Sequence, residues 1–170
     1  MQRQIFTILL MLGFSASLMA QATDPAYVKK LDKLYKHSVP VIQPDDLHEI
    51  VTAGKEFTLL DTRSSAEFEV SHIKDARFIE YNKFNKKNVA DLDRDQAIVV
   101  YCTVGYRSER IGDKLKKLGF KNVFNLYGGI FEWVNQGNTV VDANGNPTEK
   151  VHAFSKDWGK WLKTGEKIYK

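Results

Sequence analysis

Cys102 is the single cysteine of this 170-residue chain and its clearest candidate for covalent chemistry. It follows the apolar run 97–101 and precedes a short loop with Gly105 and Arg107, after which Ser108 opens a helical pattern. N–H groups at a helix start lack partners within the helix, and with the positive end of the helix dipole they stabilise a thiolate or a bound anion. A cysteine buried only for packing is the simpler alternative, but it needs neither the glycine nor the arginine. The pattern therefore predicts nucleophilic sulfur chemistry at Cys102.

Metal chemistry has little support in the sequence. The four histidines do not have the spacing of metal ligands; they are His37, His48, His72 and His152. We therefore expect no metal and no cofactor. A single cysteine cannot form an internal disulfide, so in an exported chain Cys102 is expected to be a reactive thiol.

Residues 1–22 have the pattern of a secretory signal peptide. Arg3 is followed by an apolar run over 5–20, and small residues close the segment at Ala20 and Ala22. The run is shorter than the roughly 20 residues that a membrane-spanning helix needs. Cleavage after Ala20 or Ala22 is therefore favoured over a stable membrane anchor, and the protein is expected to be exported, periplasmic or secreted.

The mature chain is expected to form one mildly basic domain. Loss of residues 1–22 leaves about 148 residues, enough for a single hydrophobic core. It also removes Arg3, which lowers the formal charge from +4 to +3. The lysines are spread along the chain rather than clustered, so no nucleic-acid partner is expected.

Hydrophobic periodicity predicts strands that alternate with helices. Strands are predicted over 39–42, 57–61, 76–79, 97–101 and 122–126. Helices are predicted over 44–54, 64–68, 107–118 and 130–134, and residues 82–95 as a polar surface connection. This alternation predicts an α/β fold with a mostly parallel central sheet and helices on both faces. Ligands bind such sheets at the carboxyl ends of the strands, where Cys102 lies.

Both terminal segments of the mature chain are predicted to pack on this domain. Asp24 caps an amphipathic helix in the extension 23–39, for which membrane-surface attachment through lysines is the alternative. The extension 138–170 is predicted to form a small hairpin and a short helix that carries Trp158 and Trp161. We expect these rings to dock on the core of the domain, with a partner-binding patch as the alternative.

Four segments, taken in order, resemble the rhodanese-like domain family, and in particular its single-domain exported bacterial members. They are Leu59–Arg63, Glu67–Ile73, Val99–Ser108 and Gly128–Trp133, and the resemblance covers roughly residues 40–137. It implies the rhodanese-like three-layer α/β fold, which agrees with the periodicity. It also implies a sulfurtransferase.

The resemblance assigns roles to residues around the cysteine. Cys102 would be the sulfur-accepting nucleophile, and Arg107 would hold the sulfonate end of a donor such as thiosulfate. The substrate-binding loop implied in this way consists of Thr103, Val104, Gly105, Tyr106 and Arg107.

The same resemblance places a structural ion pair, Asp61 with Arg63, near the site. Ser71 stands where the family often has glycine, which concerns the local turn rather than the chemistry. His72 is expected to satisfy a backbone hydrogen bond rather than to act as a general base.

The implied reaction moves a sulfane sulfur from thiosulfate or a similar donor to a thiol or cyanide acceptor through a Cys102 persulfide. One alternative is a non-enzymatic persulfide carrier or a binding module with a thiol protein partner. Another is a cysteine phosphatase or arsenate reductase. Four residues separate Cys102 from Arg107, one fewer than in the usual phosphatase loop, so this second alternative is disfavoured.

Overall fold

The computed structural model describes residues 23–169, so the predicted signal peptide lies outside the described residues. Its centre is a five-stranded parallel sheet with the strand order β1-β5-β4-β2-β3. The strands are β1 (Val41–Ile42), β2 (Thr58–Asp61), β3 (Arg77–Phe78), β4 (Ala97–Tyr101) and β5 (Asn122–Leu126). β4 lies at the middle, with Leu59 opposite Val99 on one side and Phe124 opposite Val99 on the other. The predicted α/β fold with a parallel sheet is confirmed.

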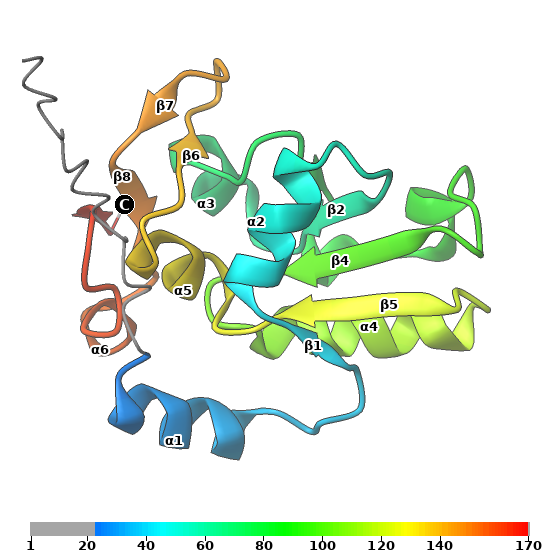
Figure 1. Ribbon diagram of the computed structural model, residues 1–170, viewed down its shortest axis with the longest axis horizontal. Coiled ribbons are helices and arrows are strands. Elements are labelled where there is room, and N and C mark those ends of the chain that lie inside the picture. The colour runs from blue at the N-terminus through cyan, green and yellow to red at the C-terminus, as the bar shows by residue number, and fades with distance from the viewer. Residues whose placement is uncertain (1–22, 170) are drawn as a thin grey trace, which may run out of the picture.

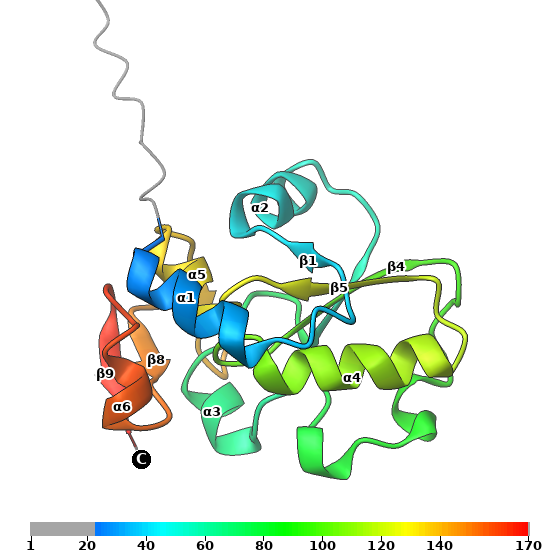
Figure 2. The same cartoon turned by 90° about the horizontal axis from the view of Figure 1, so that it is seen from below.

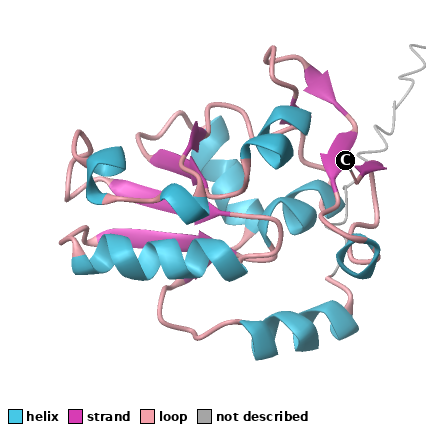
Figure 3. Ribbon diagram, turned by 180° about the vertical axis from the view of Figure 1, so that it is seen from behind, coloured by secondary structure: helices cyan, strands magenta, loops and turns pink. Residues whose placement is uncertain are grey.

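Helices cover both faces of the sheet, as predicted (Figure 2). They are α1 (Pro25–Leu34), α2 (Pro44–Thr52), α3 (Ser65–Val70), α4 (Tyr106–Lys117) and α5 (Gly129–Asn135). Alternate residues of a strand point to opposite faces, and β4 uses both of them. Ile98 and Val100 pack in one core with Ile111 of α4, whereas Val99 and Tyr101 belong to the other core. Figure 3 shows α4 lying along the sheet.

Local sequence explains where the helices near the site begin. Asp24 accepts the N–H of Ala26 and Pro25 occupies the first position of α1. Ser64 and Glu67 form a capping box that starts α3. α4 begins directly after Gly105, whose φ of +95° belongs to the left-handed region that glycine adopts without penalty.

The C-terminal segment adds two small strand pairs and one short helix. The antiparallel pair β6 (Val140–Val141) and β7 (Pro147–Thr148) forms the predicted hairpin, and β8 (Lys150–His152) pairs with β9 (Glu166–Ile168). The short helix α6 (Lys156–Gly159) is capped by Ser155. Figure 1 shows the arrowheads of β4 and β5 directed toward the end of the molecule where α1, α5, α6 and β8 gather. Both extensions therefore stand beside the carboxyl ends of the central strands.

Two details differ from the predictions. The connection 82–95 is not only surface, because Val89 is fully buried and the short 3-10 helices Tyr81–Lys83 and Lys86–Val89 fold around it. The first and third strands are shorter than the predicted 39–42 and 76–79, because only Val41 and Ile42 pair with β5 and only Arg77 and Phe78 pair with β2. Within the described residues, no helix has the length and apolar character to cross a membrane.

Candidate active site

Cys102 lies at the carboxyl end of β4, immediately before the loop that leads into α4, and is only 1% exposed. The N–H of Gly105 donates a hydrogen bond to its Sγ at 3.2 Å. The first N–H groups of α4 follow at once, and the first turn of a helix carries partial positive charge. The sulfur thus faces the Gly105 N–H and a helix start, an arrangement that stabilises a thiolate or a persulfide anion.

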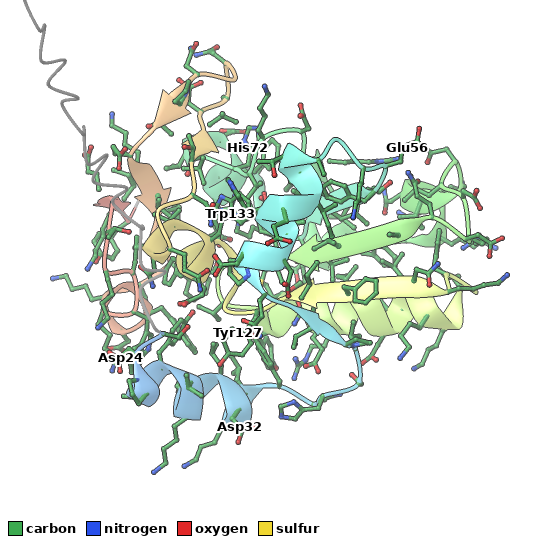
Figure 4. The ribbon with its side chains drawn as sticks, in the orientation of Figure 1. Asp24, Asp32, Glu56, His72, Tyr127 and Trp133 are labelled. Carbon is green, nitrogen blue, oxygen red and sulfur yellow. The ribbon has the colours of Figure 1, made fainter. Side chains whose placement is uncertain are left out.

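Tyr35, the residue that directly follows α1, holds the loop in this shape. The Tyr35 hydroxyl donates to the carbonyl of Val104 at 2.7 Å and accepts the N–H of Gly128 at 3.0 Å. It lies so close to Gly105 that a Cβ at this position would overlap the phenol. The Tyr127 ring meets Tyr35 edge to face, with 6.2 Å between the ring centres, and lies between α1 and β5 (Figure 4). Gly105 is therefore required both for its backbone angle and for the space that Tyr35 occupies.

The other side of the loop is fixed by β5 and α5. The Asn125 side chain donates to the carbonyl of Gly105 at 3.0 Å and accepts the Ser108 hydroxyl at 2.7 Å. The N–H of Ile130 donates to the carbonyl of Cys102 at 2.9 Å. This approach needs Gly129, since a Cβ there would overlap the Cys102 carbonyl oxygen. Segments from four parts of the chain therefore fix the loop around the sulfur.

Arg107 forms a two-point ion pair with the buried carboxylate of Glu67. Its Nη1 and Nη2 donate to Oε2 and Oε1 of Glu67 at 2.8 and 2.6 Å, and Nη2 also donates to the Thr103 hydroxyl at 2.8 Å. Thr103 in turn donates to Glu67 at 2.7 Å. Burial raises the pKa of Glu67, but the hydrogen bonds and charge of Arg107 outweigh it and lower this pKa to about 2. Burial lowers the pKa of Arg107, yet Glu67 and the nearby Cys102 raise it above its ordinary value.

A pocket of about 610 Å³ opens over Cys102. Part of its lining comes from the loop itself, namely Cys102, Thr103, Val104, Tyr106 and Arg107. The rest is supplied by Leu34 of α1, by Tyr81 and Asn82 of the 3-10 helix Tyr81–Lys83, and by Phe154 and Trp158 of the C-terminal segment. All five predicted substrate-loop positions are next to the cysteine, and Thr103, Val104, Tyr106 and Arg107 line the pocket directly. The volume lies in the range of small-molecule sites.

Asp61 and Arg63 form the predicted ion pair, fully buried and with 2.6 Å between Nη2 and Oδ2. Arg63 also donates to the carbonyl of Ser71 at 2.6 Å. Ser71, which stands where the family often has glycine, has an extended backbone with φ of −170° that any residue can adopt. His72 Nδ1 lies 3.1 Å from the carbonyl of Phe68, in agreement with the backbone hydrogen bond predicted for it.

Within residues 23–169, no group of three or more His, Cys, Asp and Glu side chains could hold a metal ion.

Comparison with known proteins decides the family. The family model described as the rhodanese-like domain matches residues 43–136, which is more than half of the chain. The chain belongs to the rhodanese-like domain family.

Relatives with this rhodanese-like domain carry different names. The chain is 33% identical over 96 residues to a probable adenylyltransferase/sulfurtransferase, MoeZ, of Mycobacterium tuberculosis. This match covers 56% of this chain and 24% of that protein. It is also 30% identical over 113 residues to a tRNA uridine(34) hydroxylase of Legionella pneumophila. This second match covers 63% of this chain and 43% of that protein. The match thus spans less than half the length of each relative.

A solved structure of a rhodanese-related protein from Thermoplasma volcanium is similar with a TM-score of 0.53 and 31% identity. It covers 60% of this chain and 97% of that one. The family match, over residues 43–136, leaves out both extensions. Since these extensions line the pocket, the rhodanese-like domain of this protein has walls that the family match does not include.

Several site residues were not predicted from the sequence. Glu67 was predicted only as part of a segment of the family resemblance, without a role of its own, and its partner Arg107 lies forty positions further along the chain. Tyr35 was predicted only as part of the extension 23–39, and Phe154 carried no signal in the sequence. Trp158 and Trp161 both pack against the core, as expected, but Trp158 also lines the rhodanese-like pocket.

Proposed function

We propose that this rhodanese-like protein is a sulfurtransferase that carries sulfane sulfur as a persulfide on Cys102. The observation that carries the proposal is the hydrogen bond of 3.2 Å from the N–H of Gly105 to the sulfur, at the base of a pocket and before a helix start. A thiolate so placed is a nucleophile that needs no separate base.

The first half-reaction takes sulfur from thiosulfate or a similar donor. The Cys102 thiolate attacks the outer sulfur, so a new S–S bond forms while the S–S bond of thiosulfate breaks and its electron pair leaves with sulfite. Arg107 uses three of its five N–H donors on Glu67 and Thr103. Its remaining donors contribute charge and hydrogen bonds to the donor anion.

The second half-reaction returns the thiolate. A thiol or cyanide attacks the outer persulfide sulfur and leaves with it, and Cys102 keeps the electron pair of the broken bond. The anionic persulfide between the two steps is stabilised by the Gly105 N–H, which donates to the sulfur, and by the start of α4. No redox partner is required, because sulfur is transferred without net oxidation.

Steady-state turnover of thiosulfate and cyanide, followed as thiocyanate, tests this proposal. We expect turnover by the wild type and none above background by Cys102→Ser. Sulfur transfer seen only to a protein partner would point instead to a persulfide carrier. Hydrolysis of an aryl phosphate that disappears in Cys102→Ser would replace the proposal with a phosphatase.

We also propose that the protein is exported, on the basis of residues 1–22. Intact mass of the protein recovered from its native host is expected to match a chain that starts after Ala20 or Ala22. Recovery of the uncleaved chain would contradict export by signal-peptide cleavage.

A further inference from the structure

The pocket over Cys102 is walled by apolar and aromatic side chains that come from the two extensions. Leu34 belongs to α1, and Phe154 and Trp158 belong to the C-terminal segment. None of the three lies within residues 43–136, the part that matches the family. These walls are therefore a property of this chain, and they enclose more space than a small inorganic anion needs.

Phe154 is held in this wall by a costly backbone conformation. Its φ is +62°, a region that bulky residues rarely adopt. The fold fixes it there through its own N–H, which donates to His152 Nδ1 at 3.1 Å. Its ring then lies 5.4 Å from the Arg107 guanidinium and remains 52% exposed. An exposed aromatic ring that is kept in a strained position beside Arg107, in the pocket that Cys102 also lines, indicates a binding role.

The charge balance of the pocket suits a monoanion better than a dianion. Arg107 is the lone positively charged side chain in the described lining, and the carboxylate of Glu67 occupies it at two points. The Arg107 guanidinium, the Glu67 carboxylate and a Cys102 thiolate together carry one net negative charge. At the outer side, the Lys30 ammonium lies 5.1 Å from the centre of the Trp158 ring. This arrangement favours a donor with one negative charge and an apolar body over doubly charged thiosulfate.

We infer that the preferred sulfur donor is an organic monoanion whose sulfane sulfur is attached to an apolar group about the size of a ring. This inference rests on the proposed sulfurtransferase function and specifies its substrate class. For an organic thiosulfonate, the Cys102 thiolate attacks the outer sulfur and forms the persulfide bond. The S–S bond of the donor breaks, and its electron pair leaves with the organic sulfinate, so no proton, oxidant or reductant is needed.

Three donors test the inference: thiosulfate, methanethiosulfonate and benzenethiosulfonate. Each kcat/KM is divided by the rate constant of the same donor with free glutathione, which removes differences in intrinsic reactivity. We expect the corrected value for benzenethiosulfonate to exceed that for methanethiosulfonate by about tenfold, from partial burial of the phenyl group. Thiosulfate is expected to be the weakest of the three.

Substitutions in the pocket wall test whether Phe154 and Trp158 cause the preference for benzenethiosulfonate. Phe154→Asn removes the ring and suits the left-handed backbone, so the variant is expected to fold. It is expected to lower several-fold the ratio of the corrected kcat/KM for benzenethiosulfonate to that for methanethiosulfonate. Trp158→Ala should do the same. Phe154→Tyr keeps a ring and should keep the ratio, as should Tyr169→Ala, which removes an exposed ring outside the pocket lining.

A corrected ratio near one in the wild type, or a ratio that neither Phe154→Asn nor Trp158→Ala lowers, would overturn the inference while leaving the sulfurtransferase intact. If no donor, thiosulfate included, places sulfur on Cys102, the proposed function itself fails.

Discussion

The charge beside Cys102 is set by individual residues, above all by the pair that Arg107 forms with Glu67. An arginine fork matched to a carboxylate is directional and keeps the guanidinium in one place. Glu67 is almost fully buried, so its negative charge is tolerated only while Arg107 and Thr103 satisfy it. The pair thus positions Arg107 for the donor and also reduces the positive charge that the donor meets.

Glu67 is expected to make the stability of the protein depend on acid pH. Its pKa is lowered from 4.5 to about 2 in the folded protein. The stabilisation is therefore present above pH 4.5 and is lost as the pH falls toward 2, and it amounts to about 3 kcal/mol in the free energy of unfolding. Denaturant unfolding across this pH range should show a shallower loss in Glu67→Gln than in the wild type. The control is Glu69→Gln, an exposed position on the same helix, and equal pH dependence in all three proteins would contradict this account.

Gly105 provides a second prediction at the residue scale. Gly105→Ala must accommodate a positive φ and a Cβ that overlaps the Tyr35 hydroxyl, so we expect a loss of about 2–4 kcal/mol in the free energy of unfolding and a large fall in turnover. Gly119→Ala is the matched control. Gly119 has a similar φ of +90° but open space around its Cβ position, so it should cost only about 1 kcal/mol and leave turnover unchanged. Equal effects of the two substitutions would mean that the contact with Tyr35 is unimportant.

The geometry of the sulfur is set by the strand, loop and helix that succeed one another around Cys102. β4 ends at Tyr101, the loop reverses direction, and α4 starts at Tyr106. This unit could be predicted from the sequence because its signals are local: an apolar run, one glycine, and helical spacing after it. The short helix at 64–68 and the hairpin in the extension 138–170 were predicted for the same reason.

The partners of that unit could not be predicted in the same way. The contact of Glu67 with Arg107 and that of Tyr35 with the loop join positions that are far apart in the chain. These contacts depend on how the strands and helices pack against one another, and the periodicity of hydrophobic residues does not determine that packing. The place of Phe154 depends on a positive φ that no local residue preference indicates. The family resemblance covered the loop but not the extensions, so it could not supply the pocket walls.

The length of the loop is expected to matter as much as its residues. Insertion of one glycine after Val104 should lower sulfur transfer at least tenfold, because the N–H groups would no longer converge on the sulfur. The comparison is an insertion of one glycine after Asn144, at the exposed tip of the hairpin, which should leave kcat/KM unchanged. Full activity with the longer loop would show that the Gly105 hydrogen bond is dispensable.

At the scale of the whole molecule, the two extensions are joined to each other as well as to the domain. The ring of Trp161 stacks on Tyr27 of α1, with 5.2 Å between the ring centres. Tyr27 in turn donates from its hydroxyl to the carbonyl of Gly128. The extensions therefore form one side of the site and tie it to the central sheet.

Loss of this stacking should destabilise the protein and open the pocket. Trp161→Ala is expected to lower the free energy of unfolding by about 2–3 kcal/mol and to speed proteolysis within residues 138–169. Lys156→Ala, an exposed position in the same segment, serves as the control. A thermal midpoint for Trp161→Ala equal to that of the control would mean that the extension is held by other contacts.

The central claim is that Cys102 carries the sulfur, and intact-mass spectrometry tests it most directly. After incubation with thiosulfate, the wild-type protein is expected to gain one sulfur atom, roughly 32 Da, through covalent catalysis at the thiol. Cyanide should remove that mass, and Cys102→Ser should never acquire it. Uptake of sulfur by Cys102→Ser to the same extent, or a wild-type mass that no sulfane-sulfur donor changes, would contradict the account.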